Sequence, residues 1–104
     1  MNNYPTLDLH NLNGRGNSVT EHDVWIALDR FINNVKLQYG RQIKTEIPVK
    51  VCIVVGKGLQ SKNFINGKNI LRFHTEKYLD KCGYYWRDGH YNQGGTGAIL
   101  ADIL

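Results

Sequence analysis

Hydrophobic and polar residues alternate near the start of the chain, in Leu7-Asp8-Leu9-His10. Alternate residues of an extended strand share a face, so this pattern predicts a strand over 7–10. Leu7 and Leu9 would then enter the core, while Asp8 and His10 would project together from the other face. A carboxylate in this position can orient an imidazole and favour its charged form.

A second pattern, apolar residues three and four positions apart, predicts an amphipathic helix that ends near Gly40. Two registers of a capping box are available at its start, Ser18 with Glu21 or Thr20 with Asp23. A glycine after the last apolar position is a natural stop for a helix. The apolar stripe of this helix comprises Val24, Ala27, Leu28, Phe31, Ile32, Val35 and Tyr39.

The same spacing returns later and predicts a helix over about 68–82. His74 falls on its apolar stripe, so we expect a packed, hydrogen-bonded core histidine there. The stripe comprises Ile70, Leu71, His74, Tyr78 and Leu79.

Continuous apolar runs indicate the remaining strands. Val49–Val55 is rich in β-branched residues, with a proline before it and a glycine after it, as is typical of a central strand buried on both faces. Residues 84–87 predict a third strand, 88–97 a glycine-rich loop, and 98–103 a closing strand. The order βαβαββ predicts an α/β fold, a two-layer sandwich, with parallel pairing across a helix and antiparallel pairing at the end.

Composition is that of a globular protein. With 104 residues, the chain is expected to form one domain, 1–104, and to be a monomer. No apolar run approaches the roughly 20 residues of a membrane span, and Met1–Pro5 does not resemble a signal peptide, so we expect no membrane contact and a cytoplasmic location. Cys52 and Cys82 are expected to be free thiols. No spacing of cysteines and histidines predicts a metal site.

Basic residues are concentrated in one part of the chain. Residues 36–87 hold eleven of the thirteen lysines and arginines, but only three acidic residues. A one-sided basic surface attracts polyanions, above all nucleic acid, although a merely soluble basic protein has the same composition. Arg15, Lys62 and Lys68 are candidate phosphate contacts, and simple solvation of each is the alternative.

Glycines gather at two points where strands end or begin. In open α/β sheets, sites form beyond the carboxyl ends of strands, which is where His10 and Gly56-Lys57-Gly58 fall. The second point is Gly94-Gly95-Thr96-Gly97, before the last strand. Such glycines let backbone approach a phosphate closely, although a tight turn explains Gly94, Gly95 and Gly97 almost as well. The glycine spacing fits neither a Walker loop nor a dinucleotide fingerprint.

Three motifs in this order resemble the small MutS-related (Smr) domain family: Leu7-Asp8-Leu9-His10, the strand that ends in Gly56-Lys57-Gly58, and Gly94 to Gly97. Gly58-Leu59-Gln60-Ser61 also resembles an extension found in stand-alone bacterial members. The resemblance implies a fold like the C-terminal domain of translation initiation factor three. It also implies nicking of DNA or cleavage of RNA, in some members on ribosome-bound messenger RNA. Two positions depart from the family pattern, Val55 where His or Thr is frequent and Asn11 where Gly is usual.

Phosphodiester cleavage needs a base, an acid and positive charge near the phosphate. We assign His10 as general base or acid, Asp8 as its orienting carboxylate, and Lys57 with the Gly56 and Gly58 amides as the phosphate cradle. The alternative is that Asp8 caps the following loop and His10 packs over it.

The sequence leaves three functional classes open. The first is an endonuclease acting on DNA or RNA with no obligatory cofactor. A divalent metal could assist it, although one carboxylate supplies few ligands for a hard cation. The second is a non-catalytic module that binds nucleic acid or the ribosome. The third is a protein-interaction domain, which would show no salt-dependent binding to nucleic acid.

Overall fold

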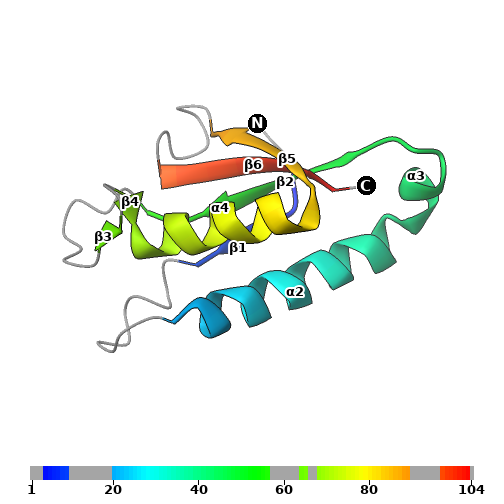
Figure 1. The fold of residues 1–104 in the computed structure, drawn as a ribbon. Helices are drawn as coiled ribbons and strands as arrows, with labels where there is room; N and C mark the ends of the chain where they lie inside the picture. Colours follow the sequence, from blue (N-terminus) through cyan, green and yellow to red (C-terminus); the bar gives the residue numbers. More distant parts are fainter. Residues whose placement is uncertain (1–3, 10–19, 57–63, 66–67, 90–96, 104) are drawn as a thin grey trace.

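The computed structural model describes residues 4–9, 20–56, 64–65, 68–89 and 97–103. The chain forms a four-stranded mixed sheet with helices on one side, so its fold is α/β (Figure 1). The elements are β1 (Thr6–Asp8), α2 (Glu21–Gln38), α3 (Gly40–Lys44), β2 (Val49–Val54), β3 (Phe64–Ile65), β4 (Lys68–Asn69), α4 (Ile70–Cys82), β5 (Tyr85–Asp88) and β6 (Ala98–Ile103).

The strand order in this sheet is β1-β2-β6-β5. β1 pairs in parallel with β2 across α2, and β6 pairs antiparallel with both β2 and β5. The predicted βαβαββ order, the parallel crossover and the antiparallel end are therefore confirmed. β2 and β6 occupy the centre, which explains why both are apolar on both faces apart from the paired Lys50 and Asp102.

Helix α2 begins as its sequence predicts. The Thr20 hydroxyl accepts a hydrogen bond from the Asp23 amide at 3.2 Å, and the Asp23 carboxylate accepts one from the Thr20 amide at 3.2 Å. The capping box thus uses the second of the two registers. The predicted stripe faces the sheet, with Val24, Leu28, Ile32 and Val35 buried.

The main core lies between the two helices and the sheet. Alternate residues of β2 and β6 enter it, and they meet the stripes of α2 and α4. On the opposite face of the sheet, Cys52, Ala98 and Leu100 form a second, smaller cluster with Tyr4 and Val54. Both cysteines are free thiols. None of the helices in the described ranges is long and apolar enough to cross a membrane.

Element boundaries differ from the prediction by more than one residue at three places. Gly40 does not end helical structure, because α3 begins there directly after the cap of α2 at Tyr39. α4 starts at Ile70 rather than near 68, because Lys68–Asn69 pairs with Phe64–Ile65 as the strand pair β3–β4. β1 ends at Asp8, although Leu9 still donates its amide to the Val54 carbonyl at 2.9 Å.

Candidate functional site

The ends of three strands meet at one edge of the sheet. Asp8 lies opposite Val54, and Val54 lies opposite Ala98, so the end of β1, the end of β2 and the start of β6 are neighbours. α2, α4 and β6 all begin at this end of the molecule (Figure 1, left). We call this the strand-end edge, defined by Asp8, Val54, Gly56 and Gly97. It lies where the sequence predicts the site.

Asp8 is exposed at this edge. Leu9 is 1% exposed and Leu7 packs against the main core, so the predicted alternation is confirmed for the described residues. Asp8 shares its row with Val54 and Ala98, which belong to the smaller cluster, and therefore faces away from the helices. The carboxylate lies on the surface that a ligand at this edge can reach.

Gly56 has a backbone conformation that suits glycine, with φ at +78°. Its amide donates to the Gly97 carbonyl at 3.0 Å, and the Val55 amide donates to the same oxygen at 2.8 Å. The Gly56 amide is thus engaged within the sheet, so the phosphate-cradle role predicted for it would require this hydrogen bond to open. The shared Gly97 carbonyl fastens the end of β2 to the start of β6, as the turn interpretation of Gly97 expects.

Val55, where the family pattern favours His or Thr, is 1% exposed and lies in the main core. Asp8 faces the other side of the sheet, toward the smaller cluster. A polar residue at position 55 would therefore point to the helices, and Val55 does not remove a polar group from beside Asp8.

Several predicted site residues lie outside the described residues, and their assignments stay predictions. For Lys68, the structure describes only the backbone, within β4. The predicted residues outside the described ranges are His10, Arg15, Lys57, Gly58, Lys62, Gly94 and Gly95.

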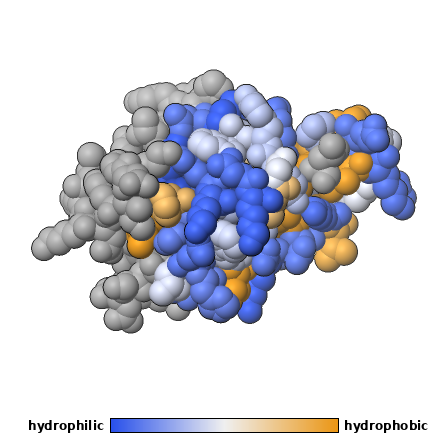
Figure 2. All heavy atoms as spheres, viewed as in Figure 1, coloured by the Kyte–Doolittle hydropathy of each residue, from blue (hydrophilic) through white to orange (hydrophobic). Residues whose placement is uncertain are grey.

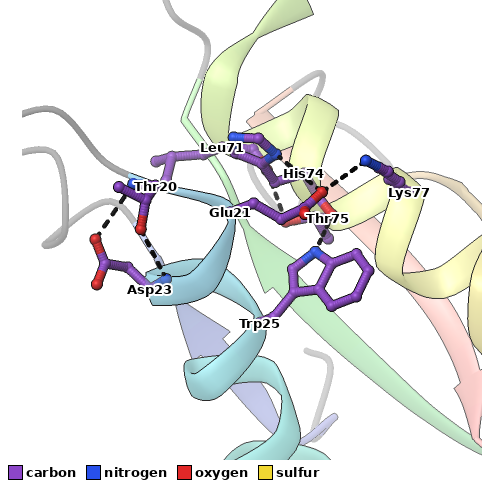
Figure 3. A network of polar contacts seen from close by, with 8 residues as sticks. All are labelled: Thr20, Glu21, Asp23, Trp25, Leu71, His74, Thr75 and Lys77. Atoms are coloured by element: carbon purple, nitrogen blue, oxygen red, sulfur yellow. Dashed lines mark hydrogen bonds and ion pairs between the residues drawn. The ribbon is translucent and has the colours of Figure 1, made fainter.

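A polar cluster joins the first turn of α2 to α4 (Figure 3). Lys77 Nζ lies 2.8 Å from Glu21 Oε1, and His74 Nδ1 lies 3.9 Å from the same oxygen. Trp25 Nε1 donates to the His74 carbonyl at 3.2 Å. His74 is buried, as its place on the stripe predicts, but its Nδ1 finds no hydrogen-bond partner in the described structure. The predicted packing is therefore confirmed, whereas Nδ1 does not supply the predicted hydrogen bond.

Burial and charge set the protonation of this cluster. Burial lowers the pKa of His74; the nearby Glu21 carboxylate raises it and Lys77 lowers it. The Lys77 ammonium, 2.8 Å from Glu21 Oε1, is the main cause that lowers the pKa of Glu21. The two lowered pKa values favour an ionised Glu21 carboxylate and a neutral His74 imidazole at neutral pH. No spacing within the sequence identifies this cluster, because it depends on two helices packing together.

Arg72 ties α4 to the edge strand β5. Its side chain is 14% exposed, its Nε lies 2.9 Å from Glu76 Oε2, and its guanidinium also contacts the Asp88 carboxylate. Asp88 is the last residue of β5, next to Gly89, whose amide donates to Ala98 at 2.9 Å. The end of β5 is thus held beside the strand-end edge by both the sheet and α4. Within the described ranges, no group of three or more Asp, Glu, His or Cys residues could hold a metal ion.

Comparison with known proteins identifies a family. The family model of the Smr domain matches residues 7–103, which is nearly the whole chain. No curated protein and no solved structure matches.

Proposed function

Because the chain belongs to the Smr domain family, we propose that it is a nucleic-acid endonuclease whose reacting phosphate lies at the strand-end edge. The family is associated with nuclease activity and nucleic-acid binding. The observation that carries the proposal is the position of Asp8, an exposed carboxylate in one row with the ends of two other strands.

In the proposed mechanism, the imidazole of His10 donates a proton to the leaving oxygen, and the Asp8 carboxylate orients that imidazole. An adjacent carboxylate favours the imidazolium form, which suits a group that donates a proton to the leaving oxygen. Lys57 supplies positive charge at the phosphate. The left-handed conformation of Gly56 is the bend at which the chain turns from β2 toward Lys57.

The substrate is DNA or RNA, including RNA on the ribosome, and the reaction has no obligatory cofactor. On RNA, the 2′-hydroxyl of the substrate is available as the nucleophile. The 2′-oxygen attacks the adjacent phosphorus and its proton passes to solvent water. The new P–O bond forms as the bond from phosphorus to the 5′-oxygen breaks, and the 5′-oxygen leaves with the proton that His10 donates, so the product carries a cyclic phosphate. Cleavage that persists in chelator and leaves cyclic-phosphate ends supports this course, whereas strict dependence on magnesium counts against it.

The alternative is a module that binds nucleic acid without cutting it. The engaged amide of Gly56 favours this alternative, because an amide that donates to Gly97 does not stabilise charge on a phosphate.

The two functions separate in one cleavage assay. Labelled RNA and supercoiled DNA are incubated with wild type, with Asp8→Asn and with His10→Ala. Asp80→Asn is the matched control, because it also exchanges an exposed carboxylate for an amide, near the end of α4. We expect Asp8→Asn and His10→Ala to slow cleavage by about 10²–10⁴-fold, the usual contribution of general acid–base catalysis. Asp80→Asn should retain the wild-type rate. Equal rates in all four preparations would reveal a contaminating nuclease and refute the assignment.

A further inference from the structure

A hollow lies at the junction of α2 and α3, which we call the elbow. Its volume is about 510 Å³. The 18 residues of α2 span about 27 Å at 1.5 Å per residue, so the elbow lies that far from the first turn of α2 beside the strand-end edge. Figure 1 shows α3 at the opposite end of the molecule from the β3–β4 pair. The lining residues are Leu37, Gln38, Tyr39, Gly40, Arg41, Gln42 and Lys44.

The elbow carries positive charge with no acid among residues 36–45. Arg41 and Lys44 are both exposed, and neither has an ion pair within the described structure. Three other cations in the described structure do pair with carboxylates: Lys50 with Asp102, Arg72 with Glu76, and Lys77 with Glu21. The charges at the elbow are thus available to an outside anion.

The demands of the core account for only part of this segment. Tyr39 and Ile43 pack against the main core, but α3 has no fully buried residue and Leu37 is 83% exposed. Glu46 follows α3 with φ at +62°, a conformation that a residue with a side chain adopts at an energetic cost. Figure 2 shows hydrophobic and hydrophilic surface side by side at this end of the molecule. A cationic surface with one apolar side chain at a hollow suits a ligand with both phosphates and flat apolar faces.

We propose that the elbow is a second contact for the nucleic acid, and that it holds a single-stranded segment of the molecule whose phosphate lies at the strand-end edge. This inference rests on the proposed function. The volume of the elbow falls within the roughly 300–1,000 Å³ of pockets that hold small ligands, so an unstacked base can enter the elbow beside Leu37. Arg41 and Lys44 contact the flanking phosphates. A duplex would present only its phosphates to this surface.

The length of α2 gives the distance that the nucleic acid must span between the elbow and the strand-end edge. With one phosphate per 3.4 Å along a stacked strand, about 27 Å corresponds to about eight nucleotides, and to fewer if the strand is extended. For a strand that runs straight and stacked, the base held at the elbow is therefore about eight nucleotides from the phosphate at the strand-end edge.

The test measures binding of a fluorescein-labelled 20-nucleotide single-stranded RNA, and of the same sequence in DNA, at several salt concentrations. The variants are Arg41→Gln, Lys44→Gln and the double variant. Arg30→Gln is the matched control, because Arg30 is also an exposed arginine with no ion pair within the described structure, but it lies in the middle of α2. Thermal unfolding checks that all variants remain folded.

Each phosphate contact contributes about 0.7 to the slope of log K against log salt for a single strand. The double variant should therefore lower this slope by about 1.4, and should weaken binding at 0.15 M salt by about tenfold. Arg30→Gln should match wild type. A photoreactive group at position 37 should crosslink within about eight nucleotides of the cleaved bond.

Unchanged slopes in the double variant would overturn the proposal and make an acidic protein segment the better occupant. An equal loss in Arg30→Gln would also overturn it, because the effect would then be one of net charge. Cleavage is measured on the same preparations and on Asp8→Asn. An elbow effect without Asp8-dependent cleavage would refute the proposed nuclease alone, whereas Asp8-dependent cleavage without an elbow effect would refute this inference alone.

Discussion

Acidification should weaken the fold through His74. Because burial lowers the pKa of His74 below its ordinary value of 6.5, the unfolded chain binds a proton that the folded chain excludes. The stability that His74 contributes is therefore fully present above pH 6.5. It is lost as the pH falls below 6.5 toward the lower pKa of the folded state.

The size of this effect is bounded by a single proton. A group that binds one more proton in the unfolded chain than in the folded chain changes the free energy of unfolding by at most about 1.4 kcal/mol per pH unit. With a urea m-value of about 1–3 kcal/mol/M, one pH unit moves the unfolding midpoint by up to about 0.5–1.4 M. The pKa of Glu21 is also lowered, chiefly by Lys77, but from an ordinary value of 4.5, so its contribution is lost only at more acidic pH. Of these two groups, His74 therefore dominates the change in stability between pH 7 and pH 5.

Urea unfolding of wild type and His74→Gln from pH 7 to pH 5 measures this effect. Glutamine keeps a polar group at the site but does not titrate, and the quantity of interest is the stability of wild type minus that of the variant. We expect this difference to fall as the pH falls. A difference that grows on acidification would refute the reasoning, because the attraction of Glu21 for an imidazolium at 3.9 Å would then outweigh burial.

Substitutions at three further positions test the fold. Thr20→Ala removes one half of the capping box and should cost about 1 kcal/mol in urea unfolding, whereas Thr20→Ser should cost little. Leu28→Ala opens a cavity at a fully buried position and should cost about 2–5 kcal/mol; a loss below 1 kcal/mol would contradict the packing described for α2. Gly89→Ala would place a Cβ 2.9 Å from the Cβ of Ala98, so hydrogen exchange of the backbone amides near the start of β6 should accelerate. Unchanged exchange would show that the backbone there shifts to accept the methyl group without loss of pairing.

Elements whose signals are local were predictable from the sequence. α2 has a capping box and a complete apolar stripe, and β2 has a continuous apolar run. The predicted bounds of both elements are therefore correct to within a residue or two. α3 and the β3–β4 pair were missed. Both are too short for periodicity to develop, and β3–β4 is defined only by pairing between two-residue strands.

The candidate site was predictable in position but not in detail. The rule that sites form at strand ends brought Asp8 and Gly56 to one edge without any contact information. The engagement of the Gly56 amide depends on a carbonyl in another strand, at Gly97, and the contact between Glu21 and Lys77 depends on the packing of two helices. Such contacts join residues that are distant in the sequence, so the local spacing of residue types does not predict them.

The central position of β6 has a consequence for biosynthesis. β6 is last in element order, yet it lies between β2 and β5, and its residue Ile103 pairs with Val49. While the domain is being translated, β2 therefore emerges from the ribosome long before its central partner and presents an unpaired apolar edge. The sheet can close only after Ile103 has left the exit tunnel. A nascent chain stalled before β6 would expose this edge to other chains, so truncated products should aggregate or require a chaperone.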